Sequence, residues 1–145
     1  MTDKPHFTQG KPSGFRLLLG YRVVEWRENF AAIEMDLEPK HMNGLGIVHG
    51  GVYATLLDAA QGHAVTYCPD PARTRICVTI SLTTSFLSPA REGRVRAEGR
   101  CIAIHDRVAT AQADMFDAAG TLLASAQASF RYMPGSEHLD GVPRG

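Results

Sequence analysis

The stretch that decides the fold covers residues 43–67 and reads NGLGIVHGGVYATLLDAAQGHAVTY. From Gly50 onward it contains no proline, and its apolar side chains recur at helical spacing: Val52, Leu56, Leu57, Ala60, Ala64 and Val65. Pro69 and Pro71 follow, and proline can neither donate a backbone hydrogen bond nor continue a helix. We therefore predict one helix over about residues 50–67.

Strand patterns lie on both sides of this helix. Residues 21–26 and 30–37 alternate apolar with polar side chains around a short turn, and residues 39–47, with Gly44 and Gly46, predict a loop. After the helix, four further strands are predicted over residues 76–87, 95–104, 108–116 and 122–132. This order is typical of an α+β fold with an antiparallel sheet. A single central helix can bury its apolar stripe only if the sheet of about six strands curls around it.

Length and composition predict one domain. The chain has 145 residues, of which 44% are hydrophobic and 21% charged, as in globular proteins. We expect a flexible segment over residues 1–12, the folded domain over residues 13–133 and a loose tail over residues 134–145.

The charge balance argues against two classes of partner. Lysine plus arginine equals aspartate plus glutamate, at 15 each, so no excess basic field favours nucleic acid. The first residues are polar, and no apolar run approaches the ~18 residues of a membrane span. We expect a cytoplasmic protein with no membrane partner.

A metal site is not expected. Cys68, Cys77 and Cys101 are odd in number, far apart and without paired spacing, so we interpret them as reduced core residues. His41, His63 and His105 also lack ligand spacing, and surface or hydrogen-bonded buried positions are expected for them.

The start of the helix has the features of an oxyanion hole. Gly50 and Gly51 fall where backbone N–H groups have no intrahelical partner and lie at the positive end of the helix dipole. Glycine also removes the side chain that would keep a ligand from the backbone. Such a donor contributes a few kcal/mol to transition-state stabilisation.

Asp58 is the only acid on the otherwise apolar helix. A buried carboxylate without a partner is costly, so it requires a reason. Its neighbours at helical spacing include Thr55 and Gln61 and form a small, partly polar face where a ligand or second chain can approach. A structural acid, hydrogen-bonded inside an interface, is the alternative.

The spacing of Gly51 and Asp58 predicts a shared site. Seven residues of helix rise about 10 Å, so Asp58 cannot easily attack a carbonyl held at its own helix start. If two helices pack antiparallel about a two-fold axis, the start of one meets the middle of the other. We therefore predict active sites across a symmetric dimer interface.

These residues resemble a known family, the hotdog-fold acyl-CoA thioesterases, in particular the phenylacetate-pathway (PaaI-like) group. The motif consists of Asn43, Gly46, His49, Gly50 and Gly51, with Asp58 seven residues beyond the second glycine. The likeness runs from about Phe15 to Tyr132 and includes the turn at residues 86–90.

The resemblance implies a role for each residue. The Gly51 amide would polarise the thioester carbonyl, and Asp58 of the other subunit would act as general base or nucleophile. Asn43 and His49 would hold the water and order the loop, and Thr79 would help to place the water. An acyl- or aroyl-CoA would be hydrolysed to the free acid and coenzyme A, by direct attack of water or through a mixed anhydride on Asp58. The resemblance implies no bound cofactor. It does imply a dimer or a dimer of dimers.

Several roles have simpler alternatives. His49 can be a loop residue that only caps or packs, Asn43 can be a turn former, and Thr79 is ordinary in a strand. Gly50, Thr55 and Gln61 are candidates for substrate contacts. Arg91 and Arg94 are candidates for the coenzyme A phosphates, although exposed arginines on strand ends are usually solvated.

Two other functions stay open for a hotdog domain. A hydratase or dehydratase acting on an enoyl or hydroxyacyl thioester would use a different His and Asp arrangement, which this sequence lacks. A non-catalytic module that binds acyl thioesters would bind the ligand and release no free thiol.

Overall fold

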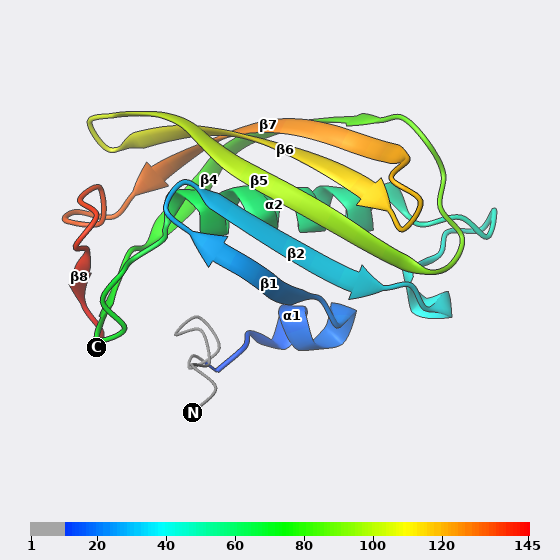
Figure 1. The fold of residues 1–145 in the computed structure, drawn as a ribbon, viewed down its shortest axis with the longest axis horizontal. Helices are drawn as coiled ribbons and strands as arrows, with labels where there is room; N and C mark the ends of the chain where they lie inside the picture. Colours follow the sequence, from blue (N-terminus) through cyan, green and yellow to red (C-terminus); the bar gives the residue numbers. More distant parts are fainter. Residues whose placement is uncertain (1–10) are drawn as a thin grey trace.

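The computed structural model describes residues 11–145. Figure 1 shows its elements, which in chain order are α1 (Gly14–Leu19), β1 (Arg22–Arg27), β2 (Phe30–Asp36), the 3-10 turn η2 (Pro39–His41), α2 (Gly50–Val65), β3 (Arg73–Thr74), β4 (Cys77–Phe86), β5 (Arg94–His105), β6 (Val108–Asp117), β7 (Leu122–Tyr132) and β8 (Val142–Pro143). The predicted helix and six long strands are all present, each boundary within two residues of its prediction.

The six long strands form one antiparallel sheet in the order β1-β2-β5-β6-β7-β4. The sheet curves around α2, which crosses its concave face (Figure 1). The predicted α+β hotdog architecture is therefore confirmed. Strands β1 and β4 are the two edges of this sheet.

The core fills the space between α2 and the sheet. Fully buried side chains come from the helix and from the strands that face it: Ile33, Met35, Leu56, Leu57, Val95, Met115 and Leu123. Helix and sheet approach closely at Gly99 of β5, where an added Cβ atom would overlap the Ala60 carbonyl group. Any side chain at this position would have to push the helix away.

The ends of α2 are fixed locally. His49 is the N-cap, with extended backbone and a ring nitrogen that accepts a hydrogen bond from Gly51 N–H. At the other end, Thr66 donates its amide to the His63 carbonyl, two residues before the proline-rich segment stops the helix. Within residues 11–145, no helix is long and apolar enough to cross a membrane.

Two terminal elements differ from the sequence-based expectation. Helix α1 is capped by the Ser13 hydroxyl and by Gly20 in the left-handed conformation, but it buries none of its residues. The expected loose tail at residues 134–145 is wrong: β8 pairs with β3, and Ser136 is completely buried. Most of the expected flexible segment 1–12 lies outside the described residues.

Candidate active site

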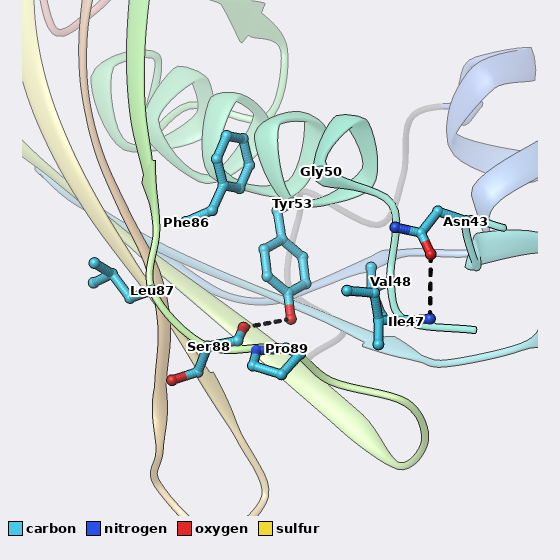
Figure 2. A pocket seen from close by; sticks show the side chains of 9 residues that line it. All are labelled: Asn43, Ile47, Val48, Gly50, Tyr53, Phe86, Leu87, Ser88 and Pro89. Carbon is cyan, nitrogen blue, oxygen red and sulfur yellow. Dashed lines mark hydrogen bonds between the residues drawn. The ribbon is translucent and has the colours of Figure 1, made fainter. Parts of the chain in front are cut away.

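The loop before α2 is ordered by Asn43. Its side-chain Oδ1 accepts hydrogen bonds from the amides of Leu45 (2.9 Å) and Ile47 (3.4 Å), the latter drawn in Figure 2. Its own backbone amide donates to the Ile47 carbonyl at 2.8 Å. Asn43 is therefore the turn former that its sequence context allowed, and its side chain also lines a pocket beside the helix start.

The two glycine amides at the helix start have different partners. Gly51 N–H donates to Nδ1 of His49 at 2.8 Å, which makes His49 the cap of the helix. The N–H of Gly50 donates to no acceptor among residues 11–145. Gly50 also packs closely on Phe86, because a Cβ atom there would lie 3.2 Å from the aromatic ring.

A mostly apolar pocket of about 400 Å³ opens beside Gly50, and we call it the Gly50 pocket. Figure 2 shows the side chains that line it: Asn43, Ile47, Val48, Tyr53, Phe86, Leu87, Ser88 and Pro89. The Tyr53 hydroxyl donates to the Ser88 carbonyl at 3.2 Å and so ties α2 to the segment after β4. Tyr53 stacks on Phe86 with a ring separation of 6.4 Å.

Asp58 lies in a second pocket, the Asp58 pocket, of about 340 Å³. Its Oδ1 accepts a hydrogen bond from the Thr79 hydroxyl at 2.8 Å. The structure thus brings together two of the residues selected from the sequence, one from α2 and one from β4. Other residues that line this pocket are Tyr21, Ala59, Gly62, His63, Thr66, Arg75, Ile76, Cys77 and Phe130.

The two pockets have no residue in common. Gly50 at the helix start belongs to one, and Asp58 in the middle of the helix belongs to the other. A single chain therefore does not place the carboxylate and the glycine amides in one cleft. The seven-residue spacing predicts this separation.

Four further residues were selected from the sequence as substrate contacts. The Thr55 hydroxyl donates to the Gly51 carbonyl (2.8 Å) on the preceding turn. Gln61 is completely buried in the core, and its side-chain Nε2 donates a hydrogen bond to the Leu57 carbonyl. It therefore does not reach either cleft. Its predicted contact with substrate is not supported.

The two arginines are engaged within the chain. Arg91 donates to the Gly46 carbonyl at 3.2 Å and supports the loop beside the Gly50 pocket. Arg94 donates to the Asp36 carboxylate at 2.7 Å, in a group of ion pairs that joins β1, β2 and β5. Arg94 lines neither pocket. An exposed arginine in a surface ion pair is therefore a better interpretation of Arg94 than a contact with the coenzyme A phosphates.

Burial, and to a smaller extent nearby charges, shift the pKa values of side chains that line the Asp58 pocket. Burial, with Asp58 as a further cause, raises the pKa of the Cys77 thiol to about 11, against a smaller opposing effect of Arg75. The pKa of Tyr21 is also raised, first by burial and then by Asp58, with Arg16 opposing. Burial lowers the pKa of His63, whose Nδ1 lies 2.8 Å from the Ala59 carbonyl. The Cys77 thiol, the Tyr21 hydroxyl and the His63 ring are therefore neutral at pH 7.

The remaining histidines have structural explanations. His41 is buried and satisfied, since Nδ1 accepts from the Glu38 amide and Nε2 lies 2.8 Å from the Leu19 carbonyl. His105 is exposed at a hairpin end. Across the part of the chain that the structure describes, no group of three or more His, Cys, Asp or Glu side chains is arranged to hold a metal ion.

Sequence reasoning missed Tyr53, Phe86 and Arg75 as lining residues. Tyr53 and Phe86 are aromatic residues of types that are common in helices and strands, so neither stands out in the sequence. Only the contact between the helix start and the end of β4 brings them to the Gly50 pocket. Arg75 precedes β4 in a stretch without a motif, and its burial depends on the C-terminal segment that covers it.

Comparisons with known proteins find related esterases and thioesterases. A protein of Halobacterium salinarum, provisionally named an esterase, is 39% identical over 128 residues, covering 81% of this chain and 83% of that one. The medium/long-chain acyl-CoA thioesterase YigI of Escherichia coli is 27% identical over 129 residues, covering 80% and 83%.

A solved structure shows the same fold. The PaaI protein of the Escherichia coli phenylacetic acid degradation operon superimposes with a TM-score of 0.74 at 18% identity, over 83% of this chain and 85% of that one. The model of the thioesterase superfamily matches residues 45–132, more than half of the chain, and includes Gly50, Gly51, Asp58 and Thr79. The protein is therefore a thioester hydrolase, and the chain belongs to the thioesterase superfamily.

Proposed function

We propose that this protein hydrolyses acyl-CoA thioesters to the free acid and coenzyme A, at sites that two subunits share. The observation that carries the proposal is the division of the machinery within one chain. Asp58 and Thr79 form one half in the Asp58 pocket, and the glycine-rich helix start forms the other half beside the Gly50 pocket. Each half needs its counterpart from a second copy.

The free edge of β4 is the surface on which a second copy would dock. In the described chain β4 pairs only with β7, and its apolar side chains Val78 (54% exposed) and Ile80 (56% exposed) face solvent. An unpaired, apolar edge strand is a template for strand addition. Antiparallel pairing of two β4 edges about a two-fold axis would join the sheets and lay the two α2 helices side by side.

In such a dimer the Gly51 amide would polarise the thioester carbonyl. Its present acceptor is Nδ1 of His49, so the carbonyl oxygen would replace that nitrogen. The unpaired Gly50 N–H lies one residue away and provides a second donor at the positive end of the helix. His49 would then be released to hold water.

Asp58 of the partner copy would supply the base or the nucleophile. Its Oδ1 is held by the Thr79 hydroxyl, which fixes the carboxylate and leaves the other oxygen for the reaction. In the direct route Asp58 takes a proton from water, the water oxygen bonds to the carbonyl carbon, and the C–S bond breaks as Asp58 returns the proton to the coenzyme A sulfur. In the anhydride route, the carboxylate oxygen bonds to the carbonyl carbon and the C–S bond breaks to expel the coenzyme A thiolate. Water then cleaves the anhydride to the free acid and the Asp58 carboxylate, and one of its protons goes to the thiolate.

The test is release of free coenzyme A from short, medium, long-chain and aryl thioesters. We expect activity on part of this panel and a loss of about 10²-fold or more in Asp58→Asn, because the base is removed. Asp114→Asn is the matched control: its carboxylate also accepts from a hydroxyl, Ser125 Oγ at 2.7 Å, but it lines a different pocket.

Two results would contradict the proposal. Full activity in Asp58→Asn would remove Asp58 from the reaction. Binding of the esters without any release of coenzyme A would favour the non-catalytic module.

A further inference from the structure

The Asp58 pocket contains a buried cation that has no ionic partner among the described residues. Arg75 is 9% exposed, and no carboxylate of residues 11–145 forms an ion pair with it. Its guanidinium instead donates to three backbone carbonyls, those of Ser136 (2.8 Å), Tyr67 (3.0 Å) and Glu137 (3.2 Å). Three of its five N–H groups are thereby used, and the charge itself is not neutralised.

Four arginines on the sheet surface differ in this respect. Arg22, Arg94, Arg96 and Arg100 all form ion pairs with glutamate or aspartate on the sheet surface. A buried charge is costly unless it is paired as well as hydrogen-bonded, so an anion beside Arg75 would gain a charge-assisted contact. The side chain also lies over the Tyr132 ring at 4.9 Å, which fixes its plane.

Arg75 lines the same pocket as Asp58 and Thr79. Along the chain, Cys77 lies between Arg75 and Thr79. The Asp58 charge raises the pKa of its thiol, and the Arg75 charge lowers it. The pocket therefore has a carboxylate at the reacting end and a guanidinium farther along. Its volume of about 340 Å³ is large enough for a short acyl group.

The distance along the chain limits the length of that acyl group. Arg75 and Thr79 are four positions apart, and an extended chain advances about 3.3 Å per residue, which gives at most about 13 Å between their backbones. A long alkyl chain would bring apolar carbon against a buried cation, and a short chain with a charged end would not.

We propose that Arg75 determines specificity, by binding a carboxylate at the far end of a short acyl group. The preferred substrates are then mono-CoA esters of short dicarboxylic acids. This inference rests on the proposed hydrolysis and adds to it the class of acyl group. The thioester carbon lies beside Asp58, and the second carboxylate completes the pairing of the guanidinium.

The experiment compares kcat/KM for CoA esters that are matched in length. Glutaryl-CoA is measured against valeryl-CoA, and adipoyl-CoA against hexanoyl-CoA. We expect the wild type to prefer the dicarboxylic member of at least one pair by about tenfold or more, since charge-assisted hydrogen bonds discriminate strongly. In Arg75→Met this preference is lost, and in Arg75→Lys, which keeps the charge, part of it remains.

Arg73→Met is the matched control. Arg73 also holds the C-terminal segment, through the carbonyls of Asp140 and Gly141, but it does not line the Asp58 pocket. Its substitution lowers stability in a similar way and leaves the substrate ratio unchanged. A shift of the ratio in Arg73→Met equal to that in Arg75→Met would reduce Arg75 to a structural role and overturn the proposal.

The outcomes separate this inference from the proposed function. If the wild type hydrolyses the esters but favours the neutral member of every pair, the Arg75 proposal is wrong and hydrolysis stands. The same holds if Arg75→Met keeps the wild-type ratio. If no CoA ester is hydrolysed, the proposed function fails, and this inference fails with it.

Discussion

At the scale of single residues, the site depends on the hydrogen bond between His49 and Gly51. The ring nitrogen of His49 occupies the amide that the proposed reaction needs. The same bond caps α2, so His49 stabilises the helix and, in the proposed reaction, would compete with the substrate for that amide. A Cβ atom on Gly51 would lie 2.9 Å from that nitrogen, which explains why glycine suits this position.

The capping role predicts the stability of His49 variants. We expect His49→Ala to lower the free energy of unfolding by about 1 kcal/mol, because the Gly51 amide loses its acceptor. His49→Asn should recover most of this loss, since asparagine is a strong N-cap. Urea denaturation monitored by circular dichroism measures both. Equal stability of His49→Ala and the wild type would show that the bond contributes nothing.

The sequence predicted the places of the candidate residues in the fold better than it predicted their hydrogen-bond partners. Asp58, Thr79 and the glycines lie where the motif implied, because helix and strand periodicity place them. The position of Gln61 could not be predicted, because it lies about 60° around the helix from Asp58, and the curvature of the sheet decides that it is covered. The bond from Gly51 to His49 depends on a side-chain rotamer, which the sequence does not specify.

At the scale of elements, the close crossing of α2 over β5 positions the site. Gly99 permits this contact because its missing side chain leaves room for the Ala60 carbonyl. The same helix carries Gly50 at its start and Asp58 in its middle, so its height above the sheet sets both halves of the site.

This contact predicts opposite effects for two glycine substitutions. Gly99→Ala should destabilise the protein by about 1–3 kcal/mol, because the added carbon overlaps the helix backbone. Gly62→Ala, within α2, meets only Phe130 at an ordinary 3.7 Å and should be neutral or stabilise by up to ~1 kcal/mol through helix propensity. Thermal and urea unfolding provide the comparison. A Gly99→Ala variant as stable as Gly62→Ala would contradict the close approach.

Long elements were predictable from the sequence, and short ones were not. Each of the six long strands has enough residues for apolar alternation or for a bounding turn to define it. Helix α1 has six residues and no buried face, so only its caps Ser13 and Gly20 signal it. Strands β3 and β8 have two residues each, and the C-terminal segment is fixed by arginine bonds to backbone carbonyls, which leave no pattern in the sequence.

At the scale of the whole molecule, the proposed function requires the edge of β4 to complete the site. Its exposed apolar side chains lie beside Thr79, so the proposed interface and the residue that holds the Asp58 carboxylate are on the same strand. Assembly and activity should therefore be lost together.

Ile80→Lys tests this coupling. We expect a charge on the β4 edge to weaken self-association and to lower activity in parallel, because lysine on an edge strand opposes strand pairing. The control is Ile102→Lys, with a comparable exposure of 54% but on β5, an interior strand of the sheet. Analytical ultracentrifugation and coenzyme A release measure the two properties. A monomeric Ile80→Lys variant with full activity would place the whole site within one chain.

The most direct test of the shared site is complementation between two inactive variants. Asp58→Asn and Gly51→Val are each purified, mixed in equal amounts under conditions that exchange subunits, and assayed for coenzyme A release. In a mixed dimer, one site combines the intact Gly51 of one copy with the intact Asp58 of the other, so random exchange should restore about one quarter of wild-type activity. If native mass spectrometry detects the mixed dimers but activity stays at the level of the parents, the two residues do not act across an interface.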